Sequence, residues 1–475
     1  MGEPAGGRVA PNAWWTPLRI LLATAALVGT LGLATKTSCA VADGHRWFST
    51  SPVPAGTSYA RLCASELPGE YATTGLAEGV LPWSRDDGRW PVNAVPLPIG
   101  ALQYASASVV HLLAQPDLDA RSSMDAVRVE VADDVRREAV AYTGLVALLS
   151  LVALLVSLVV LARASVRSRT HDALRPWPSW GAPAAALMPL AASPLVALLI
   201  GVGWDLVGVA LMSIGLAAWT AGRARTAGVV LGIAVLTAWW PLAVLLPLIA
   251  TALLRHARAA GRLVVTSVLT LVVGGAVAAV TTSGAAVGTG VQRWLYREDG
   301  VGSIWAALRE MGFDPSPQVV AAIVIAVCAF AASMTFVSAS RSGDVAQTAR
   351  FAFVLLAVML LVSTTYAPGY ALWLLPLAVL ARPVWRDLLV WQAVEVFLVV
   401  ATWWHLGQST QPVGEATDVV YVVAIAAHVA ATIWLAVRMT LVVGDSGADA
   451  SGASAPGSSG IPSPEEPHVL HELRR

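Results

Sequence analysis

The chain has 475 residues, of which 56% are hydrophobic and only 13% are charged, and its formal net charge is zero. Soluble domains usually carry about 25% charged residues, so this composition excludes an ordinary soluble enzyme. The balanced charge also gives no indication of a nucleic-acid partner. Repeated apolar segments close to the ~20 residues that cross a bilayer predict an all-α, polytopic membrane protein.

The first apolar segment covers residues 18–35 and follows a short N-terminal stretch, residues 1–17. A cleaved signal peptide and a retained anchor both fit this pattern, but residues 37–40 form a poor cleavage site. We expect a retained span with residues 1–17 in the cytoplasm, because the later topology closes with that orientation.

A basic stretch orients the next span, residues 139–162, because positively charged loops stay in the cytoplasm. Residues 36–138 then form one large outer loop. Within this loop, residues 99–114 carry small and polar side chains, which favours a helix lying on the membrane surface. A true span is the alternative, and it would place residues 115–138 inside. The basic stretch contains Arg163, Arg167, Arg169, His171 and Arg175.

The rest of the chain predicts a continuous membrane domain, residues 18–443, followed by a tail. A second outer loop is expected at residues 282–318. The Gly-, Ser- and Pro-rich residues 444–475 predict a disordered cytoplasmic tail. The remaining spans are expected at residues 182–201, 204–221, 263–281, 319–338, 388–406 and 419–437.

Two longer apolar segments are interrupted near their middle, where proline removes a helical hydrogen bond. Residues 228–254 contain Trp239-Trp240-Pro241, and residues 351–381 contain TTYAPGY at 364–370. If both segments are re-entrant hairpins, the flanking arginines stay in the cytoplasm and both tips face outward. A long kinked helix is the alternative for each segment. Broken backbone at membrane depth is tolerated only where it is buried in protein or lines a cavity.

Carboxylates, arginines and aromatic residues gather on the expected outer face. An arginine neutralises phosphate and a carboxylate deprotonates a hydroxyl, so this combination suits a reaction on a phosphorylated lipid. Solvated loop charges and an interfacial aromatic belt are the alternative, and we expect this to account for about half of the candidates. The candidates are Glu66, Glu70 and Glu78 in the first loop, Asp205 at the start of a span, Arg293 and Arg297 in the second loop, and Tyr366 and Tyr370 at a hairpin tip.

Two ionisable residues, Glu395 and His428, lie inside predicted spans. A carboxylate in a bilayer costs at least ~2.5 kcal/mol, so it usually faces a partner or a cavity. A functional role and a packing hydrogen bond explain these two residues equally well. Cys39 and Cys63 share the first outer loop, where a disulfide is chemically permitted and two free thiols are the alternative. The sequence contains no Cys/His pattern with metal-ligand spacing.

Several stretches resemble an actinobacterial group within glycosyltransferase family 87, whose polytopic enzymes use polyprenyl-phosphate sugars. Residues 62–83 resemble the first-loop pattern L-C-x-S-D-I-P-x-L-Y-x-x-R-G-L-A-E-G-x-x-P-Y. GWDLVGVAL at 203–211 resembles N-W-D-L-L-A-V-A-L, and REDGVGSIWAAL at 297–308 resembles the second outer loop of the group. The longest similar stretch, YAPGYALWLLPLAVLARPVWRDLLVWQAVEV, covers residues 366–396. The resemblance as a whole extends from residue 62 to about residue 406.

This resemblance implies a C-type glycosyltransferase-like helical bundle with broken or re-entrant helices and an active site on the outer leaflet. The implied reaction is an inverting transfer of a hexose, expected to be mannose, from a polyprenyl-phosphate donor to a glycolipid or cell-envelope glycan acceptor. Neither a metal nor a further cofactor is implied. Glu66 is the expected general base. The implied substrate-binding residues are Arg293 and Arg297 for the lipid phosphate, Asp205 and Tyr366 for sugar or acceptor, and Tyr370, Glu70 and Glu78.

The chain also departs from the pattern of this group. Glu66 replaces an aspartate, which keeps the carboxylate but lengthens its arm. The other departures are Ala94 for a glutamate, Ala238 and Thr365 for lysines, and Gly369 for a glutamine. These losses keep open a non-catalytic relative that binds glycolipid or assists assembly. A lipid or solute transporter is a further alternative, and it would need ionisable residues at mid-depth, where only Glu395 and His428 qualify.

Overall fold

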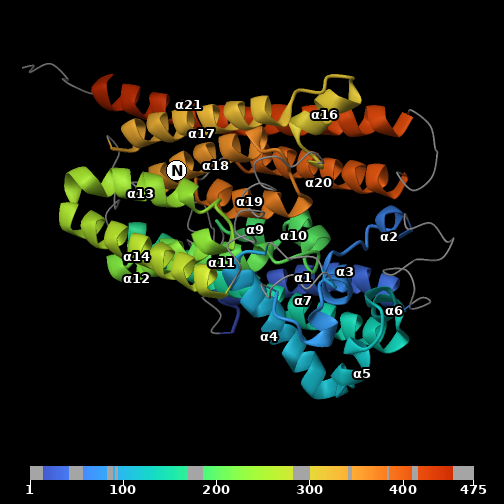
Figure 1. Ribbon diagram of the computed structural model, residues 1–475. Coiled ribbons are helices and arrows are strands. Elements are labelled where there is room, and N and C mark those ends of the chain that lie inside the picture. The colour runs from blue at the N-terminus through green and yellow to red at the C-terminus, as the bar shows by residue number, and fades with distance from the viewer. Residues whose placement is uncertain are drawn as a thin grey trace, which may run out of the picture.

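The computed structural model describes residues 14–41, 57–82, 89–90, 95–169, 186–281, 300–340, 345–381, 384–408 and 416–452 (Figure 1). Every regular element in these ranges is a helix. Seven of the described helices are long and apolar enough to cross a membrane. The chain is therefore an all-helical, multi-pass membrane protein, as its composition predicts.

The seven candidate spans form the long helices of the bundle. They lie within α1 (Pro17–Val41), α4 (Leu97–Ala114), α7 (Asp133–Arg169), α14 (Ala257–Thr281), α17 (Pro317–Ser340), α20 (Trp385–Gln408) and α21 (Ala416–Gly452). Since α4 is among them, its length allows either the surface helix or the true span that the sequence left open. The predicted tail begins inside α21, and residues 453–475 lie outside the described residues.

One predicted span is wrong. We expected a single helix over residues 182–201, but the structure has two short helices, α9 (Met188–Ala191) and α10 (Pro194–Leu199). A proline lies in the first turn of each helix, at positions 189 and 194. Proline suits a helix start because its missing N–H group has no helical partner there. Each proline therefore begins a new helix where the hydropathy alone indicated continuity.

Both predicted interruptions are present. α12 (Ala224–Thr237) and α13 (Leu242–Arg255) are separated at residues 238–241, and α18 (Val345–Val362) is separated from α19 (Ala371–Leu380) by the short turn η2 (Pro368–Tyr370). α18 packs against α19, as the two arms of a hairpin do. In contrast, α12 packs mainly against α14 and α11 (Asp205–Thr220), whereas α13 packs mainly against α17 and α18. The two helices of residues 228–254 therefore diverge and pack against different neighbours.

Small residues allow several of these helices to approach closely. A β-carbon on Gly228 or Gly232 of α12 would lie within 3.2 Å of the α14 backbone, and the Ser267 hydroxyl donates to the Gly228 carbonyl at 3.1 Å. Small residues that admit a neighbouring backbone are typical of helix contacts inside membranes. On α11, Gly208 leaves room for the indole of Trp373, which a β-carbon there would overlap.

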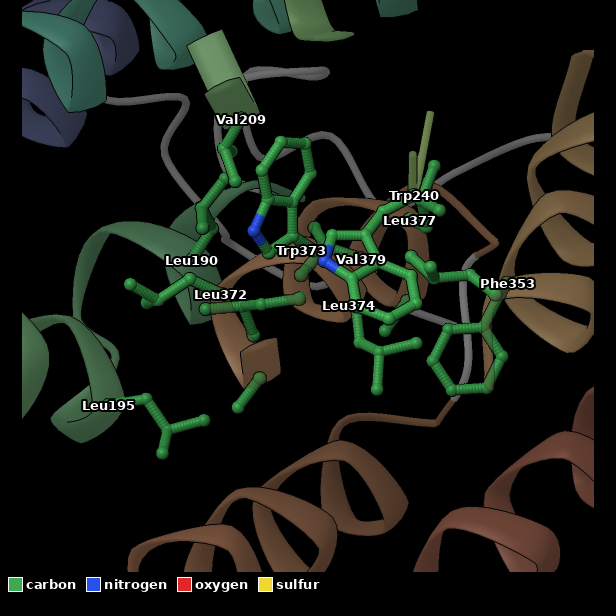
Figure 2. Packing of buried hydrophobic residues seen from close by; sticks show 14 of the residues in the cluster. Leu190, Leu195, Val209, Trp240, Phe353, Leu372, Trp373, Leu374, Leu377 and Val379 are labelled. Atoms are coloured by element: carbon green, nitrogen blue, oxygen red, sulfur yellow. The ribbon is translucent and has the colours of Figure 1, made fainter. Parts of the chain in front are cut away.

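The main core fills the centre of the bundle, around α19. Residues 371–379 of this helix are all buried, which accounts for their continuous apolar sequence. Figure 2 shows Trp373, Trp240 and Phe353 among the aliphatic side chains that surround α19. Large aromatic rings supply much of the packing energy of a core. This cluster therefore stabilises the two interrupted segments, residues 228–254 and 351–381.

A second, smaller core organises the first loop. It contains Leu67, Tyr71 and Leu76 together with Tyr142 of α7 and Trp204. The helices of this loop are α2 (Thr57–Ala60), α3 (Leu67–Thr73), η1 (Leu76–Glu78), α5 (Leu118–Ser122) and α6 (Ala126–Val131). In the view of Figure 1, α2, α3, α6 and the second-loop helix α16 (Ile304–Glu310) lie toward the same end of the bundle. The described helices of the loop thus form a packed unit against α7.

Cys39 and Cys63 form a disulfide, with 6.0 Å between their α-carbons. The bond joins the end of α1 to the segment that precedes α3. It resolves the choice between a disulfide and two free thiols that the sequence left open. Because disulfides persist in oxidising compartments, the bond fits the predicted position of the first loop outside the cell.

Candidate functional site

Glu66 stands at the start of α3 with an exposed side chain. Its backbone N–H donates to the carbonyl of Val202 at 3.0 Å. The neighbouring Ser65 hydroxyl donates to the carbonyl of Gly201 at 2.8 Å. These two bonds fix the segment before α3 against the turn that leads into α11. The predicted base is therefore on a segment with defined position, and its carboxylate is accessible.

Asp205 is the first residue of α11 and lies on the same turn. The indole Nε1 of Trp373 donates to Asp205 Oδ1 at 2.8 Å. A β-carbon on Gly203 would lie 3.8 Å from Asp205 Oδ2 and 4.0 Å from Glu66 Oε2. The two carboxylate oxygens are consequently no farther apart than the sum of these distances. A carboxylate in the first turn of a helix also interacts favourably with the positive end of the helix dipole.

The turn between α18 and α19 approaches the same carboxylate. A β-carbon on Gly369 would overlap Asp205 Oδ2, so this position can only be glycine without a rearrangement. The next residue, Tyr370, packs its ring edge-on against Trp240, with ring centroids 4.9 Å apart. Trp240 belongs to the interruption between α12 and α13. The two interrupted segments therefore meet next to Asp205.

Residues 300–305 of the second loop dock on the α18–α19 turn. The Tyr366 N–H donates to the carbonyl of Val301 at 2.9 Å, and the Trp305 indole donates to the carbonyl of Val362 at 2.9 Å. From the other side, the Gly302 N–H donates to the Tyr421 hydroxyl at 2.6 Å. Residues 300–305 thus lie beside the turn that carries Tyr366 and Tyr370.

Arg293 and Arg297, the predicted phosphate-binding residues, lie in residues 282–299, outside the described residues. Ala94, one of the departures from the family pattern, also lies outside them. Thr365, another departure, is buried, and its hydroxyl has no hydrogen-bond partner among the residues that the structure describes. Where the group that the sequence resembles has a lysine, this chain therefore has a buried hydroxyl without a hydrogen bond to the described residues.

Glu70 is held by side chains of the first loop and its neighbours. Tyr142 donates to Oε1, and the Trp204 indole donates to both carboxylate oxygens at 3.1 and 3.2 Å. Gln103 supplies a further side-chain hydrogen bond. Burial raises the pKa of Glu70 above its ordinary value, although these hydrogen bonds act in the opposite direction. These contacts favour a loop-stabilising role for Glu70 over the predicted contact with substrate.

Glu78 has a similar arrangement at the other end of the same stretch. The Arg89 guanidinium pairs with both carboxylate oxygens, and the Trp90 indole donates to Oε2 at 2.9 Å. Paired donors of this kind fix a carboxylate strongly. Glu78 therefore connects two parts of the first loop, and these contacts favour a loop-stabilising role over the predicted contact with substrate.

A buried charge network supports this loop, and sequence reasoning missed it. Arg121 donates to both oxygens of Glu138 at 2.8 and 2.7 Å, and it also pairs with Asp134. The Tyr71 hydroxyl donates to Glu138 Oε2 at 2.7 Å, and the carbonyl of Ala77 accepts from Arg121 at 2.9 Å. Arg121 and Glu138 are 17 positions apart, a separation that carries no local sequence signal.

The two ionisable residues inside predicted spans form a pair. His428 Nδ1 lies 2.7 Å from Glu395 Oε1, and the Tyr366 hydroxyl donates to Glu395 Oε2 at 3.0 Å. Thr432 donates to Oε1 at 3.4 Å. Glu395 is completely buried, so these bonds replace its lost hydration. Since the Tyr366 hydroxyl is engaged by Glu395, this phenol does not point its donor toward Asp205.

The site that the structure brings together is therefore smaller than the predicted one. It combines Glu66, Asp205 and the turn around Gly369, with Tyr366 and Tyr370 beside it. No protein-family model matches the chain, and no curated protein matches it significantly. A function for this chain is therefore inferred from the geometry of these residues and from the resemblance seen in the sequence.

Proposed function

We propose that this protein is a membrane glycosyltransferase that moves a hexose from a polyprenyl-phosphate donor to a glycolipid or cell-envelope glycan acceptor. The single observation that carries the proposal is the approach of Glu66 and Asp205 around Gly203. These residues come from two stretches that each resemble the family separately, and they are 139 positions apart in the sequence. A shared site explains why two distant motifs meet at one turn.

The proposed step is a direct displacement at the anomeric carbon. Glu66, the accessible carboxylate, takes the proton of the acceptor hydroxyl as this oxygen attacks the anomeric carbon. The bond between the sugar and the lipid phosphate breaks, and polyprenyl phosphate leaves with the bonding electron pair. Asp205, whose carboxylate accepts a hydrogen bond from Trp373, is proposed to accept another from a sugar or acceptor hydroxyl. Arg293 and Arg297 are proposed to neutralise the lipid phosphate.

A non-catalytic glycolipid-binding protein is the second candidate, and one feature of the site favours it. Thr365, Ala238 and Gly369 replace three polar residues of the family pattern. A β-carbon at Gly369 would overlap Asp205, so no side chain is accommodated here without a rearrangement. A site with fewer polar groups can still bind a lipid-linked sugar, but it has fewer groups to stabilise a transition state.

The deciding experiment is transfer from radiolabelled polyprenyl-phosphate sugars by the purified protein in lipid nanodiscs, with mannose as the first sugar and envelope lipids as acceptors. Glu66→Gln removes the proton acceptor but keeps its size, and loss of a general base costs about 100- to 10,000-fold in rate. Glu66→Asp keeps a carboxylate and should retain substantial transfer. Glu130→Gln, a change in the same loop at a residue with no described partner, is the matched control.

Two results would count against the proposal in different ways. Equal transfer by the wild type and by Glu66→Gln would reject Glu66 as the base. Absence of transfer by the wild type with every sugar and acceptor, combined with measurable binding of the lipid-linked sugar, would favour the non-catalytic candidate.

A further inference from the structure

Lys36 is the only lysine of the chain, which otherwise uses arginine for its basic side chains. It lies near the end of α1 and is 4% exposed. Its ammonium donates to the carbonyls of Leu62 at 3.2 Å and Ala64 at 3.4 Å. The nitrogen also lies 4.6 Å from the ring centroid of Trp403 on α20. Among the described residues, no carboxylate forms an ion pair with Lys36.

A buried ammonium without a counter-ion destabilises the fold unless its donors are well used. Among the described residues the partners of Lys36 are neutral, namely two backbone carbonyls and the face of an indole. A methionine of similar length would fill the same space without the cost of desolvating a charge. What the ammonium adds is a set of donors that reach two carbonyls of one segment and a charge that interacts with the Trp403 ring.

The segment that Lys36 holds has an unusual backbone. Leu62 adopts a left-handed conformation with φ 57°, which is rare for a residue with a branched side chain. Such a conformation persists only where the surroundings enforce it. Lys36 binds the carbonyl of Leu62, and the disulfide from Cys39, one helical turn farther along α1, fixes the next residue, Cys63.

The same segment continues directly into the site. Two residues beyond Ala64, the Glu66 N–H binds the carbonyl of Val202, on the turn that also positions Asp205. We propose that Lys36 is a positioning residue, which holds residues 62–66 against α1 and α20 so that Glu66 stays beside Asp205. The effect on catalysis rests on the proposed function, whereas the effect on the segment does not.

Hydrogen exchange of the backbone amides tests the holding role without any substrate. Lys36→Met should accelerate exchange in residues 62–66, including the Cys63 and Glu66 amides, which donate to Ser58 and Val202 in the wild type. Lys36→Arg should retain most of the protection, because the guanidinium also donates to carbonyls. Thr37→Met, at the neighbouring exposed position, is the control. Unchanged exchange in Lys36→Met would overturn the proposal.

The single lysine also gives a direct spectroscopic readout. Protein grown with carbon-13-labelled lysine has a single lysine ε-methylene signal, and the Trp403 ring should shift the protons of this group upfield. Trp403→Leu should abolish the shift, since it removes the ring while the site remains apolar. A signal at the position of free lysine in the wild type would show that the ammonium is not held where the structure places it, and would reject the proposal.

Kinetics then connect the segment to the reaction. Lys36→Met should lower kcat by about 100-fold, the effect expected for a misplacement of about 1 Å, with little change in KM. Faster exchange with an unchanged kcat would reject the positioning role. If the wild type transfers no sugar but Lys36→Met still exchanges faster, the proposed function fails and the holding role of Lys36 stands.

Discussion

The indole of Trp373 donates a hydrogen bond to the carboxylate of Asp205 at 2.8 Å, and this bond connects α19 to the first turn of α11. The ring itself fits into the space left by Gly208, one turn farther along α11. The bond is partly buried, and the two residues are 168 positions apart in the sequence. Asp205 therefore depends on a side chain from the α18–α19 segment for its orientation.

Trp373→Phe should separate this orienting role from simple packing. The change keeps an aromatic ring but removes the indole N–H that donates to Asp205, and hydrogen bonds to charged groups contribute about 1.5–3 kcal/mol. We expect a loss of thermal stability of that order and reduced sugar transfer. Trp385→Phe, at an exposed tryptophan, is the control. Equal losses in the two variants, measured by thermal unfolding in detergent, would contradict the role of the bond.

Arg121→Gln should be the most damaging change in the first loop. It leaves Glu138 buried and without its charged partner, a situation that typically costs 3–5 kcal/mol. Arg128→Gln removes an exposed pair with Asp125, which is expected to contribute less than about 1 kcal/mol. Thermal unfolding of both variants gives the comparison. Similar midpoints would mean that the Arg121 network does not stabilise the loop.

Glu70 predicts a pH dependence of stability. Its pKa is raised by burial in the folded state, so the folded protein binds this proton more tightly than the unfolded chain does. The resulting stabilisation is present at low pH and is lost as the pH rises from the unfolded value of about 4.3 through the folded pKa.

Glu70→Gln removes the titrating group but keeps an oxygen that accepts hydrogen bonds. The unfolding free energy of the wild type, measured relative to that of the variant, should therefore decrease as the pH increases through this window. Chemical denaturation at several pH values measures the difference. A difference that stays constant with pH would show that Glu70 titrates alike in the folded and unfolded states.

Single cysteines test the predicted topology. In a Cys328→Ser background, Arg258→Cys and Arg386→Cys should resist a membrane-impermeant thiol reagent in intact cells, because both positions are predicted to be cytoplasmic. Asp125→Cys, at an exposed position of the first loop, should react and serves as the positive control. Ready labelling at 258 or 386 would instead support a kinked span for the neighbouring interrupted segment.

The sequence predicted the helical class and both interruptions well, because apolar length and internal proline act locally. It failed for residues 182–201, where two first-turn prolines divide an evenly apolar stretch. The assignment of Glu66 and Asp205 to one active site came from the resemblance of two motifs. No periodicity or spacing in the chain would have paired them.

The roles of Glu70 and Glu78 could not be predicted for a different reason. Their partners include Trp204, which lies 134 positions from Glu70, and Arg89, which lies 11 positions from Glu78. A glutamate in a loop has the same sequence signature whether it faces water, substrate or an internal donor. Lys36 shows the same limit, since a lone lysine at the end of an apolar helix gives no sign of the carbonyls it binds.

The contact between Gly208 and Trp373 has a consequence for how this protein can diverge. Any side chain at position 208 collides with the indole, so a substitution there is tolerated only together with a smaller residue at 373. That second change would also remove the donor to Asp205. In proteins that descend from this chain, Gly208, Trp373 and the role of Asp205 should therefore be kept together or lost together.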